Sequence, residues 1–83
     1  MDTLAPTKRI IRDTLNLGQR ADQLTLDSPL LGGIPEFDSM AVVGVVAAIE
    51  EEFGVTVHDD ELSAEVFATV GSLAGFVARK IAE

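Results

Sequence analysis

The pattern of apolar and polar positions along the chain predicts three main helices. In the first of them, apolar residues recur at near-helical spacing from Leu4 to Leu15, with charged residues between them. Thr3 can cap the amino-terminal end of this helix, and Gly18 can stop it after its last turn. We therefore expect the first helix over about residues 4–16.

The next stretch, residues 19–37, has no regular period because prolines and glycines interrupt it. Its apolar side chains can anchor it on a core, and they are Leu24, Leu26, Leu30, Leu31 and Ile34. We therefore expect a long loop that packs across the core.

The clearest helical pattern runs from Asp38 to about Phe53, and Gly54 can stop it. Asp38 is a favoured N-cap because its carboxylate can accept amide hydrogens of the first turn. One side of this helix forms a core stripe of Val42, Val45, Val46, Ile49 and Phe53. The opposite side is also apolar, with Met40, Val43 and Ala47 and with Gly44 beside them. A small domain can hardly bury both sides, so the second side is a candidate docking face for a partner.

An acidic run, Glu50-Glu51-Glu52, ends the same helix. The helix dipole disfavours each negative charge in a last turn by about 0.3–1 kcal/mol. We interpret the run as a feature that fold stability does not require and that a partner bringing Arg or Lys would use.

The remainder of the chain predicts two further helices. Asp59 and Asp60 can cap a short helix over about residues 60–65, and Thr69 can cap a last helix that ends near Ala82. The core face of the last helix comprises Val70, Leu73, Val77 and Ile81. The predicted fold is all-α, a four-helix bundle with three main helices, one short helix and a long first loop, forming a single domain over residues 1–83.

Composition and charge narrow the function classes. The 83 residues contain 14 acids, 6 bases and no cysteine, for a net charge of −8. The lack of cysteine excludes disulfides, thiolate zinc sites and cysteine nucleophiles. The negative charge disfavours nucleic acid and anionic lipid as partners, and no apolar run suits a membrane span, so we expect a cytoplasmic protein. The stretch from Ala21 to Ala78 holds eleven acids and no Lys or Arg, which fits either a solvated acidic face or a docking surface for basic partners.

Catalysis and metal binding have weak support in the sequence. Asp38, Ser39 and the single histidine, His58, could be imagined as a triad. However, Asp38 adjoins Ser39 at a helix start, where it is poorly placed to orient a histidine that serves that serine, and His58 is better interpreted as a surface residue before a helix. The acidic cluster over residues 59–65 lacks the glycine and the alternating oxygen ligands of a calcium loop, so we expect a helix cap and no metal.

Ser39 is the most distinctive candidate for chemistry. It lies in the first turn of a helix, where unpaired amides and the dipole favour an anion, so a phosphate esterified to its hydroxyl would be well placed. The chain then continues through Glu50-Glu51-Glu52-Phe53-Gly54-Val55 and, after a short acidic helix, through Phe67-Ala68-Thr69-Val70-Gly71-Ser72-Leu73. The start Phe37-Asp38-Ser39-Met40 and these later segments together resemble the acyl carrier protein family. The family signature has Leu where this chain has Met40, and the resemblance covers the whole chain, mostly over residues 30–81.

The resemblance implies a specific function. In such carriers a phosphopantetheinyl transferase attaches 4′-phosphopantetheine from coenzyme A to the motif serine, which corresponds to Ser39, beside Asp38. The carrier then holds acyl intermediates as thioesters and catalyses nothing itself. Enzymes dock on the helix after the serine, and the matching positions here are Met40, Val43, Ala47, Glu50 and Glu51. We expect a monomer that meets the transferase and acyl-loading and acyl-processing enzymes through basic docking surfaces.

The resemblance leaves the pathway open. Family members commonly have an acid one turn into the helix, where this chain has Gly44, so the docking face is more apolar than usual. Fatty-acid, specialised lipid and polyketide-type biosynthesis all fit such a carrier. The alternatives are a discrete peptidyl or aminoacyl carrier and an unmodified acidic helical adaptor.

Overall fold

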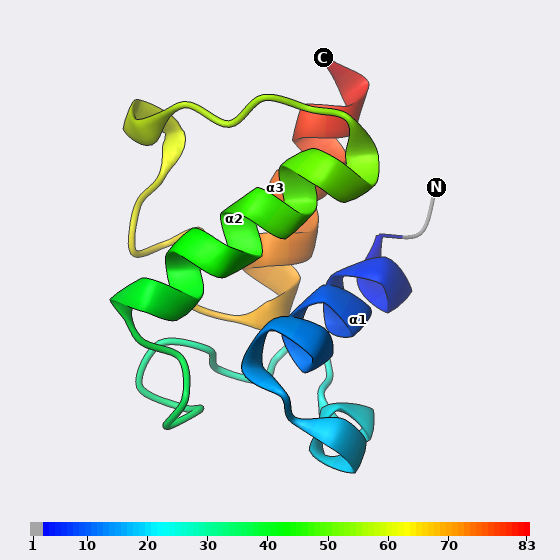
Figure 1. The fold of residues 1–83 in the computed structure, drawn as a ribbon, viewed down its shortest axis with the longest axis vertical. Helices are drawn as coiled ribbons and strands as arrows, with labels where there is room; N and C mark the ends of the chain where they lie inside the picture. The colour runs from blue at the N-terminus through cyan, green and yellow to red at the C-terminus, as the bar shows by residue number, and fades with distance from the viewer. Residues whose placement is uncertain (1–2) are drawn as a thin grey trace.

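Helix α1 (Leu4–Leu15) packs against both other long helices, α2 (Ser39–Phe53) and α3 (Val70–Ala82). The computed structural model describes residues 3–83, and two 3₁₀-helices lie in the connections, η1 (Gly18–Gln23) after α1 and η2 (Asp59–Glu61) between α2 and α3. Figure 1 shows the first connection crossing one end of the bundle, while the second leaves the far end of α2 and loops back beside it to the start of α3.

The all-α class and the three main helices are confirmed. Within residues 3–83, extended pairing is limited to an isolated bridge between Pro29 and Thr69. No helix in the described part of the chain is long and apolar enough to cross a membrane.

The core is built from all three long helices and from both connections, the second of which contributes Val66 and Phe67. Its most deeply buried side chains are Ile11, Leu30, Val45, Ile49, Val70, Leu73 and Val77. The burial of Leu30 confirms that the first connection packs across the core, and its backbone N–H donates to the Ala68 carbonyl at 2.9 Å. The prediction is wrong for two of the five anchors, because the Leu26 and Leu31 side chains are 51% and 40% exposed. At Leu26 the backbone makes the contact instead, since its carbonyl accepts the Gly71 N–H at 2.8 Å.

Helix α1 begins at Leu4 as predicted, but the capping at its two ends differs from the sequence prediction. The helix ends at Leu15, and Asn16 rather than Gly18 reverses the backbone, with a left-handed φ of 56°. Gly18, also left-handed, instead begins η1, which the sequence did not reveal. Thr3 occupies the capping position without a side-chain cap, because its buried hydroxyl donates to the Ala74 carbonyl of α3 at 2.9 Å.

The predicted short acidic helix is present, but the bounds predicted for it, residues 60–65, are wrong. The chain makes one 3₁₀ turn, η2, and is already extended at Leu62. The reason is that Glu61 uses its carboxylate within the turn, where it accepts the His58 N–H at 2.9 Å, and across to Lys80 of α3. The cap of α3 is confirmed, since the Ser72 N–H donates to Thr69 Oγ1 at 3.0 Å.

Candidate functional site

The amino-terminal end of α2 is fixed by a side-chain cap. Asp38 has an extended backbone, and its Oδ1 accepts the Ala41 N–H at 2.9 Å, which confirms the predicted N-cap. The Asp38 carbonyl accepts the Val42 N–H at 3.1 Å and so begins the helical ladder. Ser39 is therefore the first helical residue.

A buried aromatic residue anchors this turn to the core. Phe37 is 5% exposed, and its ring centroid lies 6.0 Å from that of Phe67. The Phe37 N–H donates to the Ile34 carbonyl at 2.9 Å, which ties the turn to the first connection. The backbone that precedes Ser39 is thus held by the core, and the serine is presented on its outer side.

The Ser39 side chain is exposed and forms no hydrogen bond with the residues that the structure describes. The first amides of a helix have no intrahelical acceptor, and the dipole places partial positive charge at this end. A phosphate on Ser39 Oγ would thus lie beside the free Ser39 and Met40 amides. The exposure and the amide donors fit a large phosphate-linked group.

An apolar stripe leads away from Ser39 along the outside of α2. Met40 is 76% exposed and Val43 is 63% exposed, and Ala47 is exposed one turn further on. The predicted second apolar face is therefore confirmed as solvent-facing. Gly44, which the sequence placed beside this face, is half-buried against α1, since a Cβ there would lie 2.9 Å from Thr14 Cγ2.

The acidic run at the end of α2 has mixed roles. Glu50 is half-buried, and its Oε2 accepts the Val57 N–H at 2.9 Å, which secures the turn after the helix. Glu52 forms an ion pair with Arg9 of α1. The interpretation that the fold does not use the run is therefore wrong for these two residues. Glu51 is exposed and makes no hydrogen bond or ion pair with residues 3–83, so its carboxylate is available to a partner.

The structure does not assemble the hypothetical triad. Helix α2 has 15 residues, which at about 1.5 Å each separate its two ends by about 22 Å. Ser39 lies at one end, and His58 follows the other, where it lines a surface pocket with Gly54 and Lys80. His58 is exposed before η2, as predicted. Within the described residues, no group of three or more acidic or histidine side chains could hold a metal.

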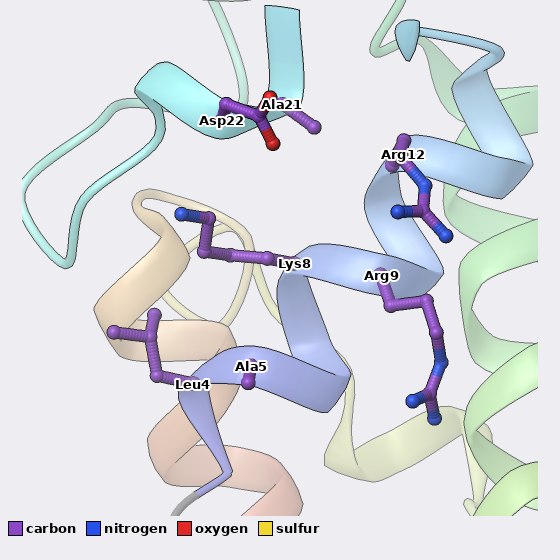
Figure 2. A pocket seen from close by; sticks show the side chains of 7 residues that line it. All are labelled: Leu4, Ala5, Lys8, Arg9, Arg12, Ala21 and Asp22. Atoms are coloured by element: carbon purple, nitrogen blue, oxygen red, sulfur yellow. The ribbon is translucent and has the colours of Figure 1, made fainter. Parts of the chain in front are cut away.

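A groove between α1 and η1 was not predicted (Figure 2). It has a volume of about 270 Å³ and is lined by Leu4, Ala5, Lys8, Arg9, Arg12, Ala21 and Asp22. Its bases do not converge on one point, because Lys8 extends to one side of α1 and Arg9 and Arg12 to the other. Arg9 and Arg12 are also occupied by ion pairs with Glu52 and Asp13. The groove therefore lacks the convergent charge of an anion site.

Two pairs of opposite charge shift the pKa values of their members. The Arg20 guanidinium of η1 donates to Glu36, two residues before the cap of α2, and lowers the pKa of that carboxyl. The Lys80 ammonium lowers the pKa of Glu61 in the same way, with help from the His58 N–H. The Arg20–Glu36 pair joins two parts of the first connection, the Lys80–Glu61 pair fastens the second connection to α3, and neither pair includes Ser39.

Comparison with known proteins agrees with this geometry. The family model described as "Phosphopantetheine attachment site" matches residues 7–77. An acyl carrier protein from Petrotoga mobilis is 36% identical over 74 residues, which make up 89% of this chain and 81% of that relative. A holo acyl carrier protein from Nitrosomonas europaea, solved in solution by NMR, is 53% identical, with a TM-score of 0.92 and coverage of 100% of both chains.

These matches extend over nearly the whole chain. They include the capped start of α2, its exposed outer stripe and the helices that hold it in place. The chain therefore belongs to the acyl carrier protein family, whose cofactor is covalently bound phosphopantetheine.

Proposed function

We propose that Ser39 is the attachment point of phosphopantetheine and that the protein carries acyl intermediates. The observation that carries this proposal is the exposed Ser39 hydroxyl, which forms no hydrogen bond with the described residues and stands on a capped and anchored turn at the start of α2. The bound group supplies a terminal thiol for thioesters, which this cysteine-free chain does not contain.

The residues around Ser39 present the serine rather than activate it. Asp38 is engaged with the Ala41 N–H, and His58 lies beyond the far end of α2. Activation of the Ser39 hydroxyl therefore falls to the phosphopantetheinyl transferase, and the carrier itself catalyses no step. Its own contribution is to hold the serine at the positive end of a helix, where the esterified phosphate gains amide donors.

The outer side of α2 is the proposed docking surface for partner enzymes. Met40, Val43 and Ala47 supply an apolar stripe that begins beside Ser39, and Glu51 and Asp38 supply exposed carboxylates near its two ends. A fitting partner has an apolar patch with a basic rim. Complementary charge of this kind speeds encounter and selects partners while allowing rapid release. Glu50 contributes from the same turn, although its carboxylate also serves the Val57 N–H.

The proposed setting is fatty-acid, specialised lipid or polyketide-type biosynthesis in the cytoplasm, with the carrier acting as a monomer. Met40 and Val43 form an exposed apolar stripe, and the half-buried Gly44 lies behind it. This surface favours partner enzymes whose docking sites are more apolar than charged. An aminoacyl or peptidyl cargo would use the same serine and the same stripe.

Intact-mass measurement tests the attachment. The purified apo-protein is incubated with coenzyme A and a broad-range phosphopantetheinyl transferase, and we expect it to gain the mass of one phosphopantetheine. Ser39→Ala should gain nothing, while the control Ser63→Ala, at another exposed serine, should react like the wild type. The same gain by Ser39→Ala would overturn the assignment. No gain by the wild type would favour the unmodified adaptor, which would need Glu51 but not Ser39.

A further inference from the structure

A buried lysine, Lys80, lies in the last turn of α3, at the end opposite to the Thr69 cap. The Lys80 side chain is 5% exposed, which is rare for a charged group unless partners surround it. Its Nζ donates to both carboxylate oxygens of Glu61, at 2.9 and 3.0 Å, and to Glu83 Oε1 at 2.9 Å. The ammonium is thus fully engaged by two carboxylates, one from η2 and one from the end of the chain.

Glu61 belongs to a segment that is otherwise lightly attached. We call residues 55–62 the strap, because they lead from the end of α2 along the outside of the bundle (Figure 1). Besides the Glu61–Lys80 pair, the hydrogen bond from the Val57 N–H to Glu50 Oε2 ties the strap to a helix. The apolar side chains of the strap, Val55, Val57 and Leu62, are only partly buried.

The contacts between the long helices do not include the strap. Helix α1 packs against α2 and against α3 directly. The most deeply buried side chains come from the three long helices and from Leu30, and none comes from the strap. Segments with few buried apolar contacts open locally at lower free energy than a core does. The strap can therefore open while the bundle remains folded.

We propose that the Glu61–Lys80 pair is a latch that holds the strap closed over the bundle, and that breaking this one pair opens residues 55–62 as a unit. Opening the strap exposes Val55, Val57 and Leu62 together with the apolar core beneath them. The latch is independent of Ser39 and of any modification there. Each partner shifts the pKa of the other toward the charged form, which agrees with an attractive contact.

Hydrogen exchange measured by NMR tests the latch on the unmodified protein. The reporters are the amides of His58, Glu61 and Leu62, which are hydrogen-bonded within the strap. In Lys80→Met, whose unbranched side chain keeps the packing of the lysine stem, we expect exchange at these three amides to rise about tenfold or more. Amides in the middle of α1 and α3 should stay within about twofold of the wild type.

Two further variants make the test specific. Glu61→Gln should accelerate the same three amides, because a neutral amide is a weaker partner for the ammonium. Glu83→Gln is the matched control, since Glu83 shares the Lys80 ammonium but makes no hydrogen bond or ion pair with residues 55–62, and it should leave the strap amides within about twofold. Unchanged strap exchange in Lys80→Met, or equal acceleration over the whole bundle, would overturn the proposal.

The wild type provides an independent measurement if a variant fails to fold. In low urea, the free energy of the opening through which the strap amides exchange should depend only weakly on the urea concentration, because that opening exposes little surface. Core amides should show the steeper dependence of global unfolding. Identical dependence for both sets would show that no separate opening of the strap exists.

Discussion

At the scale of single residues, Gly44 sets the approach of α1 to α2. A Cβ at this position would lie 2.9 Å from Thr14 Cγ2, closer than side chains normally come. In isolation, glycine costs a helix about 1 kcal/mol relative to alanine. The space that it leaves for the Thr14 methyl group explains why a helix otherwise rich in branched residues has a glycine here.

A double-mutant comparison tests this contact. In the Thr14→Ser background, which lacks the methyl group, Gly44→Ala should raise the free energy of unfolding by about 1 kcal/mol through helix propensity. In the wild-type background the same change should lose most of this gain, because the new Cβ displaces the Thr14 methyl group. The measurement is urea denaturation of the four proteins. An equal effect of Gly44→Ala in both backgrounds would contradict the contact.

Single side-chain contacts show which parts of the structure can be predicted from the sequence. Asp38 and Thr69 cap their helices through amides three residues away, so the local sequence contains the whole interaction. Thr3, in contrast, donates to Ala74, 71 positions along the chain, and Lys80 pairs with Glu61 across 19 positions. Such long-range partners are set by packing, which no local pattern records, and they are the ones that the sequence missed.

At the scale of elements, α2 has two apolar sides with different roles. Val45 and Ile49 are fully or almost fully buried against the core, while Met40 and Val43 face solvent. Both sides were predicted from spacing alone, because a helical period reveals faces. Which side faces the core was also predicted, although Ala41, which is buried too, was missed in the stripe.

Substitutions on the two sides of α2 should have opposite consequences. Val43→Asp should change the free energy of unfolding by less than about 1 kcal/mol, because its side chain is exposed, yet slow modification by the transferase about tenfold. Ile49→Ala should lower the free energy of unfolding by about 2–5 kcal/mol through a core cavity. Thermal denaturation and the rate of mass gain measure the two effects.

The matched control for Val43→Asp is Gln23→Asp, which adds the same charge at an exposed position of η1. Gln23→Asp should leave the modification rate unchanged, because η1 lies outside the proposed docking surface. If both variants slow modification equally, the cause is net charge rather than the α2 stripe.

The connection that contains η2 should respond to acid. The pKa of Glu61 is lowered by the Lys80 ammonium first and by the His58 N–H second, so the ionised form is favoured in the folded state. Its contribution to stability is therefore fully present above about pH 4.3, the ordinary value for a glutamate, and is lost as the pH falls through the lower folded value. The groups that act on Glu61 are Lys80, with Glu83 sharing the same ammonium, and His58 from its own segment.

A carboxyl titration followed by NMR checks this direction. Glu61 should titrate below the ordinary glutamate value of about 4.3, and the stability of Glu61→Gln should decline less steeply than that of the wild type as the pH falls below that value. Acid also reduces the overall negative charge and so weakens the repulsion within the folded protein. This opposing effect acts on the wild type and on the variant alike, so the comparison of the two cancels it. A Glu61 midpoint at or above the ordinary glutamate value of about 4.3 would exclude the predicted pairing.

At the scale of the whole molecule, three of the six Lys and Arg residues tie elements together. Arg9 joins α1 to α2, Arg20 joins η1 to the turn before α2, and Lys80 joins α3 to η2. The long stretch without Lys or Arg therefore receives its counter-charges from both ends of the chain. The sequence showed this uneven layout, but only the fold shows that it is also an internal network.

The family and the position of the candidate site were accessible from the sequence because they depend on a contiguous helix with its cap. The form of the two connections was not, since η1 and η2 are too short to have a helical period of their own, and η2 is held by the pairing of Glu61 with the distant Lys80 of α3. The groove beside η1 and the strap, which contains η2, both involve these connections.

The central claim is that Ser39 carries the phosphopantetheine, and peptide mapping of the modified wild-type protein tests it most directly. After incubation with coenzyme A and the transferase, the protein is digested and the modified peptide is fragmented by tandem mass spectrometry. The account predicts one phosphopantetheine, located on Ser39. A modification located on Ser28, Ser63 or Ser72, or on no serine at all, would contradict it.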